Sequence, residues 1–361
     1  MPAVPVSAID TIVADAIEQR IFPGAVVRVA RDTIVLHNAA YGATTYDAPE
    51  RMPVTPTTIY DIASLTKMFT ATAALRLYEE CLIDLEAPVG AYLPAFRAHN
   101  VTIRHLLTHT SGLDLRLSTL CRSGRDALLA TVYHTLPAHP PGSRVAYTNI
   151  NSLLLGEIVA TVSGQPLNRA IDALICQPLG LRHTMFCPDS ALLARIAPTE
   201  FDDAWRGRLI HGTVHDESAY ALGGVAGHAG LFSTADDLWR FCRAWLPPTP
   251  DCAGGSFLQP ETIALATTNH TSGLTLACGL GWMIDRPNFM GPAPSGSYGH
   301  TGFTGPALVI IPQHRVIIIV LSNRVHPRRS APRHHAVTAA IVAATLDSIT
   351  VRHRETLHTL T

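Results

Sequence analysis

Two pairs of apolar segments, one pair near each end of the 361-residue chain, constrain the fold more than any other sequence feature. Near the start, Gly24–Ala30 and Thr33–Ala39 read as the two strands of a hairpin, separated by a short polar turn. Near the other end, Ala307–Ile311 and Val316–Leu321 form a second predicted strand pair. We therefore expect an α+β fold in which an antiparallel sheet, built from both termini and flanked by helices, carries an inserted, mainly helical lobe.

The sequence between and around these strands has helical periodicity. The predicted helices cover residues 10–20, Ser64–Leu82, Ile103–Thr108, Ile150–Val162 and Ala336–Ile349. No internal repeat or long linker separates independent units, so the sequence predicts one domain over residues 1–361. We expect its α/β lobe at about 1–63 and 290–361 and its helix-rich lobe at about 64–289.

The composition restricts the classes of partner. A hydrophobic content of 47% with only 15% charged residues describes a well-filled globular protein. The net charge of −1, without a basic block, gives no indication of a nucleic-acid or anionic-membrane partner. The expected partner is a small-molecule or peptide substrate, and the oligomeric state stays open. Lacking a basic segment followed by an apolar one at its start, the chain is expected to be cytoplasmic, or periplasmic or extracellular if a leader was removed.

The cysteines and histidines give no indication of a metal site or a cofactor. The seven cysteines are far apart and contain no Cys-x-x-Cys pattern, which fits reduced thiols better than a disulfide framework. They are Cys81, Cys121, Cys176, Cys187, Cys242, Cys252 and Cys278. The 18 histidines are scattered, so we predict neither a metal nor a cofactor.

The chain contains a single lysine, and its position is informative. Lys67 is the one lysine among 27 Lys and Arg residues, and it follows Ser64 by three positions. On a helix this spacing places the amine beside the hydroxyl. A buried lysine can act as a base, which arginine cannot, so the pair has the parts of an activated serine nucleophile. Taken alone, Ser-x-x-Lys is a short pattern that also occurs by chance on solvated helix faces.

Two further groups of residues accompany this pair. Tyr147 and Asn149 are predicted on a loop before the helix at 150, a position from which side chains can point into a cleft. Tyr147 alone also fits an ordinary half-buried tyrosine, and Asn149 fits an N-cap equally well. The third group, His300-Thr301-Gly302-Phe303, leads into the strand at 307, and alone it fits a turn before an edge strand.

In combination and in this order, the three groups resemble the signatures of the serine β-lactamase and penicillin-binding protein superfamily. The resemblance extends to Leu106–Leu113 (LLTHTSGL) and to the Gly-rich stretch Gly223–Asp237. The Tyr-x-Asn form resembles the class C and D-alanyl-D-alanine carboxypeptidase branch, and His211–Gly230 with His-Thr-Gly is most similar to the penicillin-binding protein 4B-like subgroup.

The resemblance implies roles for the residues. Ser64 would be the nucleophile, and Lys67, held neutral by burial and Tyr147, would accept its proton. Tyr147 would pass the proton to the leaving group and later activate water. The backbone N–H groups of Ser64 and Phe303 would hold the oxyanion.

Substrate binding is implied for five residues. Asn149 would hold the amide of the acyl side, and His300 and Thr301 would contact a carboxylate or other polar end. Gly302 and Phe303 complete the predicted substrate-binding set. Because the third motif begins with His instead of the usual Lys, a neutral or partly charged His300 would attract a carboxylate less strongly, and we expect less β-lactam hydrolysis. His228 and the His215–Asp216 pair are second-tier candidates in the Gly-rich region beside the expected cleft, with a structural role favoured over catalysis for each. His109 is expected to be a packing residue near the Ser111-Gly112 turn.

Three functions share this machinery. The leading prediction is a serine hydrolase that forms an acyl-enzyme with a D-alanyl peptide, a β-lactam or a small ester. The alternatives are a biosynthetic acyltransferase of the same fold and a penicillin-recognising sensor that is acylated once. They differ in the acceptor and in the rate of deacylation.

Overall fold

The computed structural model describes residues 6–46, 51–247, 256–329 and 334–358. Its strands are β1 (Gly24–Arg31), β2 (Ile34–Gly42), β3 (Tyr60–Asp61), β4 (Met185–Phe186), β5 (Phe201–Asp202), β6 (Arg208–Leu209), β7 (Leu231–Ser233), β8 (Met283–Ile284), β9 (Tyr298–Thr301), β10 (Ala307–Ile311) and β11 (Val316–Ser322). Its helices are α1 (Val6–Glu18), α2 (Thr66–Glu79), α3 (Ile103–Leu107), α4 (Arg125–His134), α5 (Asn149–Ser163), α6 (Leu167–Ile171), α7 (Gln177–Leu179), α8 (Glu217–Ala221), α9 (Ala235–Arg243), α10 (Pro260–Thr267), α11 (Pro287–Met290) and α12 (His334–His358).

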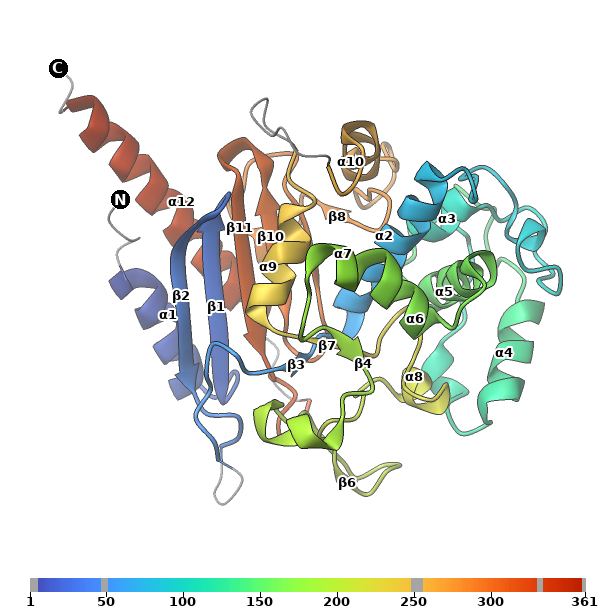
Figure 1. Cartoon of the computed structure of the whole chain (residues 1–361), viewed down its shortest axis with the longest axis horizontal. Helices are drawn as coiled ribbons and strands as arrows, with labels where there is room; N and C mark the ends of the chain where they lie inside the picture. The colour runs from blue at the N-terminus through green and yellow to red at the C-terminus, as the bar shows by residue number, and fades with distance from the viewer. Residues whose placement is uncertain (1–5, 47–50, 248–255, 330–333, 359–361) are drawn as a thin grey trace.

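The main sheet joins the two ends of the chain, as the sequence predicts (Figure 1). Its strand order is β2-β1-β11-β10-β9-β8, and every neighbouring pair is antiparallel. In the pair β1–β11, where the two ends of the chain meet, Ala25 lies opposite Ser322 and Arg31 opposite Val316. The α+β prediction is thereby confirmed.

Both faces of the sheet are buried, which explains the continuous apolar run of β11. Because side chains alternate between faces along a strand, Val316, Ile318 and Val320 pack with α1 and α12, whereas Ile317 and Ile319 join the larger core. On that second face α9 lies across β1 and β11 (Figure 1). Burial on both sides removes the alternation that a half-exposed strand would show.

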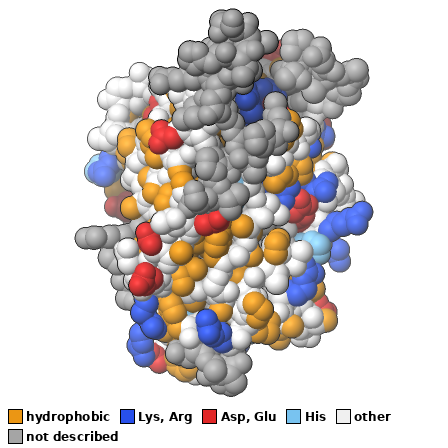
Figure 2. Space-filling model, turned by 90° about the vertical axis from the view of Figure 1, so that its left-hand side faces the viewer, with side chains coloured by type: hydrophobic (Ala, Val, Ile, Leu, Met, Phe, Trp, Pro, Cys, Tyr) orange, Lys and Arg blue, Asp and Glu red, His pale blue; other side chains and the backbone are white. Residues whose placement is uncertain are grey.

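The edge strand β2 is the exposed side of this sheet. Ile34 and Val35 are 47% and 42% exposed near its beginning. Figure 2 views the molecule from this side, where hydrophobic side chains lie among charged ones. A few exposed apolar residues of this kind are common on protein surfaces.

The helical lobe is organised around α2, which runs through its centre (Figure 1). Every residue from Thr66 to Leu75 is buried, so this helix has no solvent face. The helix at 64–82 predicted from the sequence is observed as a short 3-10 turn, η1 (Ala63–Leu65), followed by α2. Helix α5 packs beside α2.

The division of the chain into two lobes at residues 64 and 290 stays a prediction. Two elements from within 64–289 lie against the main sheet: β8 forms its edge, and α9 covers β1 and β11. Their sequences gave no periodicity that would separate them from the helical lobe. In the described ranges, no helix combines the length and apolar character that a bilayer crossing requires.

Candidate active site

Ser64 lies at a break in a buried segment. From Thr58 to Leu75 every residue is buried except Ser64, which is partly exposed in η1. The preceding Ala63 has a φ of +46°, a conformation that L-residues seldom adopt, and its N–H donates to Asp61 Oδ1 at 2.8 Å. The backbone thus turns sharply just before α2 and leaves the Ser64 hydroxyl open to the cavity in front of the helix.

Lys67 is held against Ser64 as the sequence predicts. Its Nζ donates to Ser64 Oγ at 2.8 Å and to the carbonyl oxygen of His228 at 3.1 Å. The side chain is buried, and Nζ lies 5.0 Å from the centre of the Tyr147 ring. The lone amine of the chain therefore contacts the exposed hydroxyl, an aromatic face and one carbonyl.

Tyr147 lies on the loop before α5, as predicted, but it is not a half-buried residue. It is 42% exposed, and its ring lies between two histidine rings, with centroids 4.7 Å from His109 and 5.8 Å from His300. His109, predicted as a packing residue, is buried but packs directly on the candidate catalytic tyrosine.

Asn149 is the first residue of α5, and the N-cap position belongs to Thr148. The N-cap interpretation of Asn149 is therefore wrong. Its amide instead donates to Asp216 Oδ2 at 3.4 Å. The other oxygen of Asp216 accepts from Ser218 Oγ at 2.6 Å and lies 3.1 Å from His228 Nε2.

His300 is buried on β9, with Nδ1 2.8 Å from the Thr301 carbonyl oxygen. Burial, together with the positive charge of Lys67, lowers the pKa of His300 to about 3. The same two causes lower the pKa of His109 to about 3. Both shifts favour the neutral ring near pH 7, the first of the two forms predicted for His300.

The segment after β9 is anchored beside Ser64. A Cβ on Gly302 would lie 2.6 Å from the Ile62 carbonyl oxygen, so only glycine permits this approach. Thr304 Oγ1 donates to the Asp61 carbonyl at 2.7 Å, and Arg324 Nε donates to the Phe303 carbonyl at 2.8 Å. These contacts hold the Phe303 peptide next to the turn that carries Ser64.

The Gly-rich stretch is fixed by a close backbone approach to α5 and a hydrogen bond from α2. A Cβ on Gly227 would lie 2.0 Å from the Ser152 carbonyl oxygen. The carbonyl oxygen of Gly227 accepts a hydrogen bond from Thr70 Oγ1 at 2.9 Å. This contact places the next carbonyl, that of His228, over Lys67.

A cavity of about 370 Å³ joins these groups. Of the predicted residues, Ser64, Tyr147, Asn149, Thr301, Gly302 and Phe303 line it. Lys67 lies behind Ser64, and His300 lines a smaller neighbouring cavity with Tyr147. Residues not predicted as site residues also line it: Ser118, His215, Asp216, Glu217, Met283, Arg324, Arg329, His334 and His335. They come from loops and element ends, where the sequence carries no periodic signal.

His215 belongs to a charged network at the edge of this cavity. Its backbone N–H donates to Asp61 Oδ2 at 2.7 Å, and its Nε2 lies 2.8 Å from Glu200 Oε2. Burial alone would raise the pKa of Glu200, but hydrogen bonds with His215 and Arg329 lower it to about 2. The His215 ring also lies 5.6 Å from the Phe303 ring.

Six cysteines are free thiols, and Cys252 lies outside the described residues. Within the described ranges no group of three or more His, Cys, Asp or Glu side chains is placed to hold a metal ion.

Comparisons with known proteins identify the family. The β-lactamase family model matches residues 9–343. A curated relative from Escherichia coli (strain K12), named "Putative D-alanyl-D-alanine carboxypeptidase", is 32% identical and is covered over 81% of its length by 86% of this chain.

Solved structures show the same fold. A penicillin-binding protein homologue from Caulobacter crescentus has a TM-score of 0.75 at 21% identity, with 96% of this chain and 99% of that chain covered. EstCE1, described as a hydrolase with promiscuous acyltransferase activity, has a TM-score of 0.73 at 23% identity, with 92% and 97% covered. The family model matches most of the sequence, and the curated relative is matched over 81% of its length, so the chain belongs to the β-lactamase family of serine hydrolases.

Proposed function

We propose that the protein cleaves an amide bond next to a small, carboxylate-bearing leaving group, as a D-alanyl-D-alanine carboxypeptidase does, through an acyl-enzyme on Ser64. The observation that carries the proposal is the 2.8 Å contact between Lys67 Nζ and the exposed Ser64 hydroxyl. A nucleophile and a proton acceptor within hydrogen-bond reach are what covalent acyl transfer requires.

In this mechanism Ser64 Oγ attacks the carbonyl carbon and its proton moves to the Lys67–Tyr147 pair. The tetrahedral oxyanion is bound by the N–H groups of Ser64 and Phe303. The C–N bond then breaks, and the proton is delivered to the leaving nitrogen, which leaves the acyl group on Ser64. A water molecule activated by the same pair hydrolyses the ester. The anchoring of Gly302–Thr304 beside Ile62 supports this assignment of the oxyanion site.

The leaving group is expected on the side of Tyr147 that faces His300. There a cavity of about 50 Å³ is lined by both residues and by Arg286, so a small leaving group is favoured. A neutral His300 supplies no positive charge for a carboxylate. Arg286 supplies one, and no described carboxylate lies within ion-pair distance of it. We therefore assign carboxylate recognition on the leaving-group side to Arg286.

The first test is intact-protein mass spectrometry over time with a fluorescent penicillin and, separately, with N-acetyl-D-alanyl-D-alanine. The expected result is a Ser64 adduct with the penicillin and release of D-alanine from the peptide. Ser64→Ala should abolish both, and persistent labelling of that variant would contradict the proposal.

The same experiment separates the alternatives. A stable adduct without peptide turnover would indicate a sensor. Turnover that rises strongly when a primary amine or alcohol is added would indicate an acyltransferase.

A further inference from the structure

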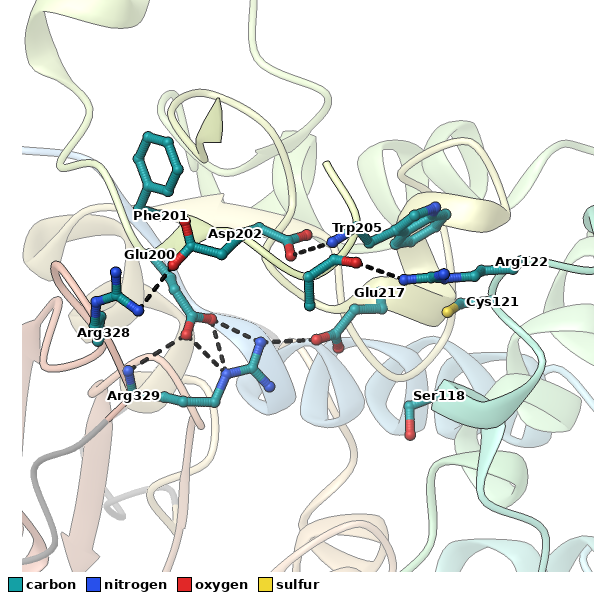
Figure 3. Close-up of a pocket in the computed structure, with 12 residues that line it drawn as sticks. Ser118, Cys121, Arg122, Glu200, Phe201, Asp202, Trp205, Glu217, Arg328 and Arg329 are labelled. Carbon is teal, nitrogen blue, oxygen red and sulfur yellow. Dashed lines mark hydrogen bonds and ion pairs between the residues drawn. The ribbon is translucent and has the colours of Figure 1, made fainter. Parts of the chain in front are cut away.

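The cavity that contains Ser64 and Asn149 opens into a larger one. The second cavity, shown in Figure 3, has a volume of about 620 Å³, and Ser118, Glu217 and Arg329 line both. Figure 3 shows Glu217 and Arg329 side by side, joined by an ion pair of 2.8 Å. Since Asn149 is the residue proposed to bind the acyl amide, this open direction belongs to the acyl group. We therefore expect the length of the acyl group to be little restricted.

The cavity on the leaving-group side is small by comparison. It lies beside Tyr147 and His300 and has a volume of about 50 Å³. A water-sized group needs about 10–15 Å³ of such a volume, so roughly four of them fit. Any selection of substrates by size therefore falls on the leaving group.

Two side chains lie where the small cavity meets the cavity of Ser64. Tyr147 and Met283 line both cavities, and in the part of the chain that the structure describes no other residue does so. A leaving group that extends from Ser64 into the small cavity must therefore lie between these two side chains. We call this pair the Tyr147–Met283 constriction.

Met283 is the adjustable side of this constriction. The Tyr147 ring is held between the rings of His109 and His300, with centroids 4.7 and 5.8 Å away. Met283 is half-buried on β8, opposite Gly299 of β9, which adds no side chain beside it. A methionine side chain has three rotatable bonds and fills irregular gaps. The width of the constriction therefore depends on the side chain at position 283.

We propose that Met283 determines the size of the leaving group that the protein accepts. The favoured substrates are amides and esters whose leaving group is about as small as D-alanine, whereas the acyl group can be long. The placement of the leaving group on this side rests on the proposed function. The position of Met283 between the two cavities does not.

The test compares peptides in which N-acetyl-D-alanine is joined to D-alanine, D-valine or D-phenylalanine as the leaving residue. One methylene in an apolar pocket is worth roughly 10- to 200-fold, so the wild-type kcat/KM for the D-alanine peptide should exceed that for the D-phenylalanine peptide about tenfold or more. Met283→Ala widens the constriction and should reduce this ratio to about threefold or less.

A second series keeps D-alanine as the leaving residue and changes the acyl group from acetyl to butyryl or hexanoyl. Met283→Ala should leave the ratios within this series unchanged, because the acyl group extends away from Met283. A general loss of packing would instead affect both series alike.

Two control variants accompany Met283→Ala. Met283→Leu nearly conserves the side-chain volume and should keep the wild-type preference for D-alanine. Met185→Ala removes a half-buried methionine that lines neither cavity and should keep it too. Thermal melts of all three variants establish that they are folded.

Thioesters separate failure of this proposal from failure of the proposed function. With S-ethyl and S-cyclohexyl thioesters of N-acetyl-D-alanine, Ser64 Oγ bonds to the carbonyl carbon, the C–S bond breaks, and the thiol leaves with the serine proton. Mass spectrometry of the Ser64 adduct gives the two rates without any amide cleavage.

A preference for the S-ethyl thioester that Met283→Ala removes supports the constriction even if no peptide is hydrolysed. Equal wild-type rates for small and large leaving groups, or a preference unchanged by Met283→Ala, overturn this proposal and leave the proposed function standing. Absence of Ser64 acylation by every peptide and thioester overturns both.

Discussion

Lys67 donates from Nζ to the carbonyl oxygen of His228 at 3.1 Å, so the position of the amine depends on the position of that carbonyl. The His228 ring is fully buried and lies 3.1 Å from Asp216, which also accepts from Asn149. Burial alone would raise the pKa of Asp216, but the charge and hydrogen bond of His228 hold it well below its usual range. The Asp216 carboxylate thus contacts both His228, whose carbonyl oxygen accepts from Lys67, and Asn149, the residue proposed to bind the acyl amide.

This relationship predicts the effect of Asp216→Asn. The substitution keeps the shape but removes the charge, so His228 and Asn149 lose their common anionic partner. We expect kcat to fall roughly 10- to 100-fold, comparable with the loss of a residue that orients a functional ligand, and stability to fall by about 3 kcal/mol, in the range for breaking a buried ion pair. Steady-state kinetics and denaturant melts measure the two effects.

Asp189→Asn is the matched control, because Asp189 likewise caps a short helix but lies outside the site cavity. It should leave kcat unchanged. Wild-type kinetics in Asp216→Asn would contradict the positioning role.

Lys67→Arg tests whether the amine transfers a proton. Arginine stays protonated in proteins and cannot accept the proton of Ser64, so acylation should slow by roughly 10²- to 10⁴-fold, the range of general-base catalysis. The rate of adduct formation with a fluorescent penicillin, followed by mass spectrometry, measures this. Near-normal acylation would eliminate Lys67 as the base.

The neutral histidines predict a loss of stability in acid. His300 and His109 have pKa values of about 3 in the folded protein and an ordinary value near 6.5 when unfolded. Below about pH 6.5 the unfolded chain binds protons that the folded one does not, so stability falls as the pH is lowered. Between pH 6.5 and 5.0 each of these two buried histidines should lower the free energy of unfolding by about 2 kcal/mol.

The free energy of unfolding of His300→Gln should therefore fall by about 2 kcal/mol less than that of the wild type when the pH is lowered from 7.5 to 5.0. Denaturant melts measure this difference. His134→Gln, at the exposed end of α4, serves as the control and should follow the wild type. An identical pH profile for His300→Gln would refute the assignment of a depressed pKa in the fold.

Gly302→Ala tests the close approach of the β9 end to Ser64. The Cβ of an alanine at position 302 would lie 2.6 Å from the Ile62 carbonyl oxygen, so the Phe303 peptide must shift away from it. Removing one oxyanion donor costs roughly 10²- to 10³-fold in kcat, and we expect a loss of that order. Gly90→Ala is the control, because its Cβ would meet other atoms only at 3.8 Å or beyond. An active Gly302→Ala would place the oxyanion site elsewhere.

The sequence predicted the elements whose signal is local. The strands at both termini, the helix that follows Ser64 and the loop position of Tyr147 all rest on periodicity or on turn residues, and the structure confirms them. The Ser64–Lys67 contact follows from helical spacing alone.

Contacts between segments that are distant in the sequence could not be predicted from local patterns. Asp216 lies 67 residues from Asn149, and no local pattern distinguishes it from an ordinary helix cap. Arg324 and Arg329 follow β11 without a motif, and their positions at the cavity depend on the whole sheet. The depressed pKa of His300 depends likewise on burial that only the folded chain provides.

The pairing of β1 with β11 has a consequence for the synthesis of the protein. Ala25 meets its partner Ser322 only after nearly the whole chain has left the ribosome. Ser64 and Lys67 are made early, but Gly302, Phe303 and the strand that carries His300 are made late. Because contacts between distant segments form slowly, the nascent chain carries the proposed nucleophile for most of translation without the later groups that the proposed site needs. The order of the sequence thereby delays assembly of the proposed site until β9, β10 and β11 have been made.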